Sequence, residues 1–163
     1  MEKYQNPALS PLERAVDLTD RMTVEEQCGQ LIYDAPAIER LGIPAYNWWN
    51  EGLHGLARAG VATMFPQAIA LAAMFDAEGM KAVADVISTE TRAKYNEISK
   101  HEDRDIYKGL TLWSPNINIF RDPRWGRGHE TYGEDPYLTG RMGTAFIRGL
   151  QGEGKYRKLD ATV

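Results

Sequence analysis

The chain reads Leu110-Thr-Leu-Trp-Ser-Pro-Asn-Ile-Asn-Ile-Phe120 at the point that decides its fold. This run has strand character, and Pro115 indicates that a regular ladder of strand hydrogen bonds stops near that residue. A long loop rich in Gly, Arg and acidic residues follows as far as about Pro136, and a helix is predicted from Tyr137 to about Leu150. A strand, a loop and a helix in this order form the repeating unit of α/β folds.

The residues before this unit predict two helices and a first strand. Ser10 and Glu13 form a capping-box pattern for a helix from about Pro11 to Arg21, and Thr23 repeats the pattern for a second helix. In the second helix Cys28 shares a face with apolar neighbours, which predicts a small buried hydrophobic side chain. The apolar and aromatic run from 41 to 51 is predicted to be a strand that leads into a loop.

Two more helices are predicted between the strands. Residues 65–75 are nearly all apolar, which predicts a buried helix with Pro66 in its first turn, and Asp76 caps an amphipathic helix that reaches about Asn96. Residues 99–108 are highly charged and are predicted to be a solvated loop. The order of elements is alternating α/β and favours parallel strands joined by crossover helices, although two strands are too few to close a barrel.

Composition excludes several classes of function. Lys+Arg 19 against Asp+Glu 23 gives a net charge of -4, and such a field repels phosphate backbones and anionic lipid, so neither nucleic acid nor a membrane is expected as a partner. One cysteine and three histidines are too few for a structural zinc site, so we expect no metal. No apolar run is long enough to cross a membrane, and the first residues lack the pattern of a signal peptide, which favours the cytoplasm.

Two loops concentrate the polar chemistry, and each follows a predicted strand. The first holds Trp48, Trp49, Glu51 and His54, and the second runs from 121 to 135 with three arginines and several carboxylates. Loops at the carboxyl ends of parallel strands build the ligand sites of α/β folds, so both loops could face one pocket. Indole rings pack on the C–H faces of a sugar, and carboxylates and guanidinium groups bind its hydroxyls.

Structural roles compete with ligand binding at each of these residues. Trp48 and Trp49 are as easily explained by packing as by stacking on a ligand, and Trp113 and Trp125 favour packing. A salt bridge to a loop arginine is the alternative role for Glu51. We expect most of the loop arginines to be tied to neighbouring carboxylates. The histidines His54 and His129 are expected to be hydrogen-bonded structural residues.

Three blocks carry a resemblance to a known family. They are Asn47-Trp-Trp-Asn-Glu-Gly-Leu-His-Gly-Leu-Ala-Arg, then Phe65-Pro-Gln-Ala-Ile, then Trp113-Ser-Pro-Asn-Ile-Asn-Ile-Phe-Arg-Asp-Pro-Arg-Trp-Gly-Arg-Gly-His-Glu-Thr-Tyr-Gly-Glu-Asp-Pro-Tyr. In order and spacing they resemble the N-terminal half of the catalytic barrel of glycoside hydrolase family 3. The resemblance implies an α/β fold for residues 1–163, the N-terminal portion of a (β/α)8 TIM-type barrel that this chain leaves incomplete, without the second α/β domain.

The resemblance also implies a function and a set of site residues. The family contains retaining, exo-acting β-glycosidases that need no cofactor and act on terminal sugars of small glycosides or oligosaccharides. Arg127 matches the family arginine that binds the sugar next to the scissile bond, Glu51 matches the carboxylate that grips its hydroxyls, and Trp49 lines the same subsite. Many glucosidases of the family carry Asp where this chain has Glu51, so the sequence is more similar to the β-xylosidase branch, with a β-glucoside as the next candidate substrate.

The family's catalytic residues are expected outside this chain. The nucleophilic aspartate and the acid/base glutamate of the family lie beyond the point that matches Val163, so we assign no catalytic residue here and expect the piece alone to be inactive. Lys100 and His101, in the charged loop, are assigned to the solvated surface. A non-catalytic carbohydrate-binding or interaction module is the alternative. An incomplete barrel would leave strand edges uncovered, so self-association is expected.

Overall fold

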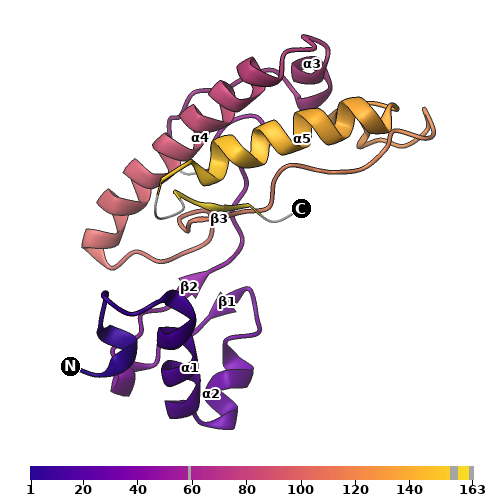
Figure 1. Ribbon diagram of the computed structural model, residues 1–163. Helices are drawn as coiled ribbons and strands as arrows, with labels where there is room; N and C mark the ends of the chain where they lie inside the picture. The colour runs from indigo at the N-terminus through magenta and orange to yellow at the C-terminus, as the bar shows by residue number, and fades with distance from the viewer. Residues whose placement is uncertain (59, 155–157, 162–163) are drawn as a thin grey trace. The chain divides into compact units, whose positions relative to one another are not determined.

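The computed structural model describes residues 1–58, 60–154 and 158–161 (Figure 1). The chain forms two compact units, Met1–Tyr46 and a second that begins at Asn47.

The first unit is helical with a short strand pair. It contains η1 (Lys3–Gln5), α1 (Pro11–Arg21), α2 (Val24–Gly29), β1 (Asp34–Ala35) and η2 (Glu39–Leu41), and β1 pairs with β2 (Tyr46–Asn47) where the unit ends. Both predicted capping boxes are present, because the backbone N–H of Glu13 donates to Ser10 Oγ and that of Glu26 donates to Thr23 Oγ1, each at 3.2 Å. The helix predicted from Pro11 to Arg21 is confirmed.

The prediction that Cys28 is buried is wrong, because its side chain is exposed. The apolar residues that share its face are exposed as well, Val24 at 70% and Leu31 at 86%. The α2 helix is only six residues long and none of its side chains is buried. The helix ends at Gly29, so Leu31 lies beyond it and the helical face predicted for Val24, Cys28 and Leu31 forms only in part.

The second unit alternates helices with short strands. It contains α3 (Ala68–Ala72), α4 (Ala77–Ile98), η3 (Ser99–His101), β3 (Thr111–Leu112), η4 (Gly128–Glu130), α5 (Pro136–Gln151) and β4 (Asp160–Ala161). The β3 and β4 strands are parallel, with Thr111 opposite Asp160 and Leu112 opposite Ala161. On the other side of β3, Asn50 forms an isolated parallel bridge to Leu112. Three parallel segments joined through helices confirm the alternating α/β order that the sequence predicted.

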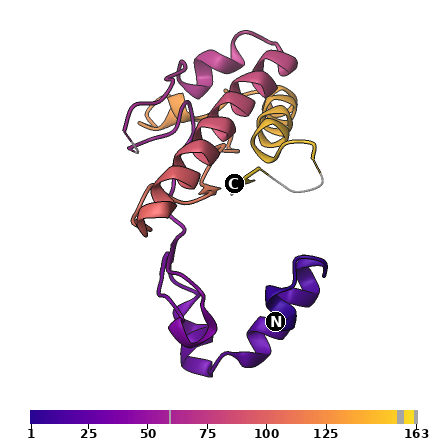
Figure 2. The same cartoon turned by 90° about the vertical axis from the view of Figure 1, so that its left-hand side faces the viewer.

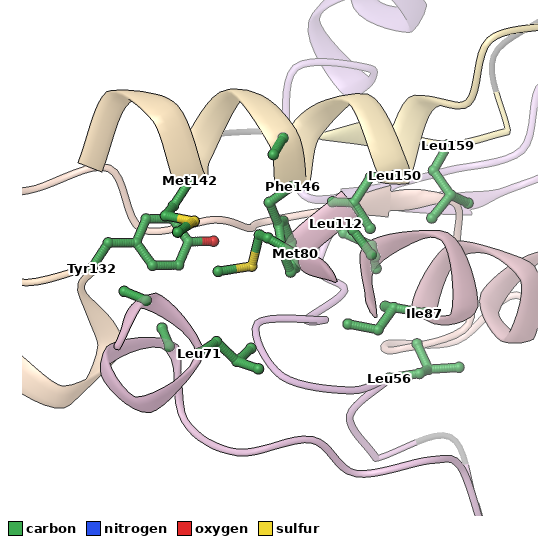
Figure 3. Close-up of a cluster of buried hydrophobic side chains, with 14 residues drawn as sticks. Leu56, Leu71, Met80, Ile87, Leu112, Tyr132, Met142, Phe146, Leu150 and Leu159 are labelled. Carbon is green, nitrogen blue, oxygen red and sulfur yellow. The ribbon is translucent and has the colours of Figure 1, made fainter. Parts of the chain in front are cut away.

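The core of the second unit lies between α4, α5 and β3. Figures 1 and 2 show α4 and α5 side by side, and in Figure 3 Phe146 of α5 lies next to Met80 of α4. Met80, Ile87, Leu112, Phe146 and Leu150 are all fully buried. This apolar layer anchors β3 from one side, so the segments that follow the strand start from a rigid base.

Two helix predictions in this unit have different outcomes. The amphipathic helix capped by Asp76 is confirmed as α4, whose N-terminal Gly79 N–H donates to the Asp76 side chain at 3.0 Å. The buried helix predicted over 65–75 is present but shorter, since α3 covers only Ala68–Ala72. At one end the Phe65 N–H donates to the carbonyl of His54 at 2.7 Å instead of entering the helix, and at the other Phe75 has a left-handed φ of 52° and is 76% exposed.

The strand predicted after Leu110 is shorter than expected. The Trp113 N–H still donates to the Asn50 carbonyl at 2.8 Å, as part of the Asn50–Leu112 bridge. The ladder ends there, since the next contact involves a side chain, with the Gly52 N–H donating to Ser114 Oγ at 3.2 Å. Pro115 follows and has no N–H to donate. The final helix is confirmed as α5, which begins at Pro136 with Asp135 as its N-cap.

Candidate functional site

The first loop is held in place by one buried amide. The side chain of Asn50 is fully buried, and its Nδ2 donates to the carbonyls of Asn47 and Thr111, both at 3.1 Å. Its Oδ1 accepts from the Gly109 N–H at 2.6 Å. Successive side chains of an extended segment point to opposite faces, so burial of Asn50 directs Trp49 and Glu51 to the other side.

The second loop makes a tight turn against an aromatic ring. Around η4 the Thr131 N–H and its hydroxyl donate to the Gly128 carbonyl at 3.1 and 2.7 Å. A Cβ at Gly128 would lie 2.8 Å from Cδ2 of Phe120 and closer still to the neighbouring ring carbons, so only glycine permits this approach. The turn therefore packs on Phe120, and this packing fixes the backbone positions of Arg127 and Glu130 relative to each other.

The two loops line one open pocket of about 480 Å³. Its lining combines two indoles, two carboxylates, one guanidinium, two imidazoles and several small or amide groups: Trp49, Glu51, Leu53, His54, Gly55, Ala57, Gln67, Trp113, Ser114, Asn116, Arg127, His129 and Glu130. Pockets of this size are typical of small-ligand sites. All the lining residues belong to the second unit of the chain.

Two tryptophans form one wall of the pocket. The rings of Trp49 and Trp113 are stacked, with centroids 5.2 Å apart and planes at 16°. The indole Nε1 of Trp49 donates to Oε1 of Glu51 at 3.3 Å, which links the aromatic wall to the carboxylate. Trp113 is 47% exposed. Trp113 thus packs on Trp49, as expected, and it also lines the pocket. Trp125 lies against Phe120, with centroids 6.3 Å apart.

A bidentate ion pair forms the charged side of the pocket. The Arg127 Nε donates to both carboxylate oxygens of Glu130 at 3.0 Å, and Nη2 donates to Oε2 at 2.6 Å. This contact lowers the pKa of Glu130 and raises the pKa of Arg127, and the charge of Glu51 adds a smaller increase to the pKa of Arg127. Both groups therefore stay ionised near neutral pH.

The three predicted binding residues, Trp49, Glu51 and Arg127, come together in this pocket. Of the described residues, none of the loop arginines lies within 4.0 Å of the Glu51 carboxylate, so the salt bridge considered for it is not formed. Arg124 pairs with Asp122 at 2.5 Å, as most loop arginines were expected to do. His54 has the structural role expected of it, with Nδ1 2.9 Å from the Phe65 carbonyl.

The remaining candidates lie elsewhere or were overlooked. Lys100 and His101 have side chains 65% and 75% exposed, which confirms their assignment to the surface. Ser114, Asn116 and Gln67 line the pocket although no role was predicted for them from the sequence. The position of Ser114 just before Pro115, where the strand ladder was predicted to stop, was the available signal, because strand ends supply the ligand groups in α/β folds.

Neither a metal-binding cluster nor a membrane-spanning helix is found among the described residues. No group of three or more His, Cys, Asp or Glu side chains is placed to hold a metal ion within ranges 1–58, 60–154 and 158–161. Over the same ranges no helix is both long and apolar enough to cross a bilayer. Stacked indoles, two carboxylates and one guanidinium suit a neutral ligand that is rich in hydroxyl groups and has apolar C–H faces.

Comparison with known proteins places these features in a family. The N-terminal domain of glycosyl hydrolase family 3 matches residues 15–162. A xylan 1,4-beta-xylosidase of Xylanibacter ruminicola is 52% identical over 161 residues, which are 96% of this chain and 19% of that protein. A probable beta-D-xylosidase of Arabidopsis thaliana is 50% identical over 151 residues, 86% of this chain and 19% of that protein.

Solved structures show the same fold. A family 3 exo-beta-xylosidase in complex with a xylobiose aziridine activity-based probe superposes with a TM-score of 0.86 at 34% identity, over 97% of this chain and 21% of that one. A beta-glucosidase of Erythrobacter marinus gives a TM-score of 0.76 at 29% identity, over 99% of this chain and 26% of that one. These likenesses confirm the expected fold class, an α/β segment of a TIM-type barrel.

The chain spans about a fifth of the length of the curated relatives it matches. Those relatives are glycosidases by name, which agrees with the family that the sequence blocks indicated. The blocks around Glu51 and Arg127, the pocket that they line and the domain match all fall within residues 15–162. The chain therefore belongs to glycosyl hydrolase family 3, as a member of its N-terminal domain.

Proposed function

We propose that the pocket binds the terminal sugar of a β-linked substrate, with a β-xyloside favoured over a β-glucoside, in a retaining, exo-acting β-glycosidase. The observation that carries this proposal is that Trp49, Glu51 and Arg127 line one pocket although they come from two distant loops. The names of the relatives favour xylose, since several are beta-xylosidases and one structural neighbour holds a xylobiose-derived probe.

Each of the three residues has a physical role in this proposal. The stacked indoles offer an apolar surface to the C–H face of the sugar ring. Glu51 accepts hydrogen bonds from sugar hydroxyls, and Arg127 donates N–H groups to sugar oxygens. Together these groups fix the orientation of the sugar, and they exclude ligands that cannot supply both hydroxyl groups and an apolar face.

We place the bond-breaking carboxyl groups outside these 163 residues. Retaining hydrolysis uses two carboxyl groups about 5 to 5.5 Å apart, one as the nucleophile and one as acid and then base. Glu51 and Glu130 are the two carboxylates of the pocket, but Glu130 is occupied by Arg127 through three hydrogen-bond contacts and has a lowered pKa, which makes it a poor proton donor. This part of the protein then supplies binding and orientation.

Matched arginine variants test the proposal. Arg124 and Arg127 lie in the same loop and each pairs with a nearby carboxylate, but only Arg127 lines the pocket. We expect Arg127→Gln to weaken D-xylose binding roughly tenfold, the effect of losing a hydrogen bond from a charged group, and Arg124→Gln to leave it unchanged. Binding is measured by nuclear magnetic resonance titration of folded samples that are checked by circular dichroism.

Activity assays on the same samples separate the competing roles. No hydrolysis of an aryl β-xyloside together with saturable xylose binding supports a sugar-binding site whose catalytic groups lie elsewhere. Turnover that Glu51→Gln or Glu130→Gln abolishes would place catalytic carboxylates in this chain and overturn that assignment. Equal loss of binding in the Arg124 and Arg127 variants would contradict the role of Arg127.

A further inference from the structure

Two arginine–carboxylate pairs in one loop differ in a way that suggests a role for Glu130. The Arg124 side chain is 89% exposed and its partner Asp122 is 43% exposed, and neither lines the pocket. The Arg127 side chain is 69% exposed, but that of Glu130 is only 23% exposed, and both line the pocket. In the second pair, therefore, the long and exposed side chain of Arg127 binds a carboxylate, that of Glu130, which is itself largely buried.

The geometry of the pair leaves part of the guanidinium available. Glu130 engages Nε and Nη2 of Arg127, and no described residue accepts from Nη1. A guanidinium is planar with five N–H donors in fixed directions, so binding two of its nitrogens on one edge determines where the other donors point. The remaining donors belong to a side chain that lines the pocket.

Glu130 can act as a fixed anchor because its backbone is held on both sides. Its N–H donates to the Arg127 carbonyl at 3.0 Å within η4, and the next residue, Thr131, is fully buried and bonded to Gly128. Gly128 in turn packs on the ring of Phe120. The Arg127 side chain is 69% exposed and has no comparable backbone support. Ordering an exposed arginine costs considerable rotamer entropy, and the contact with Glu130 offsets that cost.

We infer that Glu130 is a positioning residue that holds the Arg127 guanidinium in the orientation that binds the sugar. The inference rests on the proposed function of the pocket and goes beyond it, because it assigns Glu130 an effect on ligand affinity that acts only through Arg127. Without Glu130, the Arg127 side chain would have to be ordered by the sugar itself, and binding would bear that entropic cost.

Single substitutions give the first test. We expect Glu130→Gln, which keeps the size of the side chain, to weaken D-xylose binding roughly tenfold, and Glu130→Asp, which keeps the charge on a shorter arm, to recover part of the loss. Asp122→Asn is the matched control and should bind xylose as the unchanged protein does. Binding is followed by nuclear magnetic resonance titration, with circular dichroism of each variant.

A double-mutant cycle distinguishes positioning from general stabilisation of the loop. If Glu130 acts through Arg127, the variant that carries Glu130→Gln and Arg127→Gln should bind no more weakly than Arg127→Gln alone. A purely structural role predicts that the two losses add and that the thermal midpoint falls. The Nε–H resonance of Arg127 gives a direct signature, since loss of its carboxylate partner should make this proton exchange faster with water in Glu130→Gln.

The outcomes separate this inference from the proposed function. If the unchanged protein does not bind xylose, the proposed function fails, whatever the Arg127 resonance shows. If it binds xylose and Glu130→Gln binds equally well, or if the losses in the cycle add, the positioning role alone is overturned. If Glu130→Gln does not fold, Glu130→Asp decides the question: binding weakened with an intact circular dichroism spectrum supports positioning, and unchanged binding with a fast-exchanging Arg127 Nε–H refutes it.

Discussion

At the scale of single residues, Glu51 combines a structural contact with the proposed binding role. Its carboxylate accepts from the Trp49 indole at 3.3 Å and its charge contributes to the raised pKa of Arg127. One group therefore links the aromatic wall of the pocket to its charged side. The length of this side chain should then affect both the position of the indole and the space left for the sugar.

The length of Glu51 leads to a prediction about substrate preference. Glu51→Asp removes one methylene, which opens room for the hydroxymethyl group of a hexose and withdraws the carboxylate from a pentose. We expect the ratio of β-xyloside to β-glucoside activity of the complete enzyme to fall by roughly tenfold, since a methylene in a pocket is worth about 1–3 kcal/mol of discrimination. The measurement is kcat/KM on the two aryl glycosides, and an unchanged ratio would show that side-chain length at this position does not set specificity.

At the scale of elements, the close packing of α4 and α5 supports the core beneath β3. A Cβ at Gly149 would lie 2.6 Å from Cβ of Ala84 and closer still to the carbonyl of Lys81, so the two helices approach at a position that only glycine allows. The Ser88 hydroxyl also donates to the Gly149 carbonyl at 3.2 Å across this contact. The helix pair is therefore sensitive to added volume at this one turn.

Two glycines of α5 give a matched test of that packing. Gly149→Ala should destabilise the protein by about 1–3 kcal/mol, because the methyl group forces the helices apart. At Gly140 a Cβ would meet nothing within 4 Å, so Gly140→Ala should be neutral or stabilise by up to about 1 kcal/mol through helix propensity. Urea unfolding followed by circular dichroism measures both changes, and equal effects at the two sites would contradict the packing argument.

Local signals predicted the helices better than the strands. Ser10, Thr23 and Asp76 each cap a helix through contacts within three residues, so the starts of α1, α2 and α4 follow from short segments. The strands depend on partners far away in the chain, as Leu112 pairs with Asn50 and Ala161. Apolar character alone could not show that β3 is two residues long.

At the scale of the whole molecule, the chain exposes many large apolar side chains. Leu12, Val24 and Leu31 of the first unit are 74%, 70% and 86% exposed, and Val61 and Met64 of the second are 94% and 81% exposed. Single exposed apolar residues are common on soluble proteins, but apolar residues that gather on one helix face mark surfaces that are covered by something else.

This exposure predicts self-association of the 163-residue chain. We expect its weight-average sedimentation coefficient to rise with protein concentration, and Leu31→Lys to reduce that rise because burying a lysine at a contact is unfavourable. Ala8→Lys makes the same change of charge at another exposed position and should have little effect. A sedimentation coefficient that is independent of concentration would show that the exposed apolar faces do not drive association.

The sequence by itself determined the alternating α/β order, the starts of α1, α2 and α4 and, through the family blocks, the binding candidates Trp49, Glu51 and Arg127. These follow from short-range capping, from periodicity within one helix and from motifs that are contiguous in the chain. Only the tertiary structure decided that Trp113 stacks on Trp49 in the pocket, that Phe75 and Cys28 are exposed, and that Arg127 lines the pocket while Arg124 does not. The physical reason is that burial of a side chain, and its position in a pocket, depend on which distant segments of the chain pack together. Arg124 and Arg127 lie in one loop beside similar neighbours, so the local sequence cannot tell them apart.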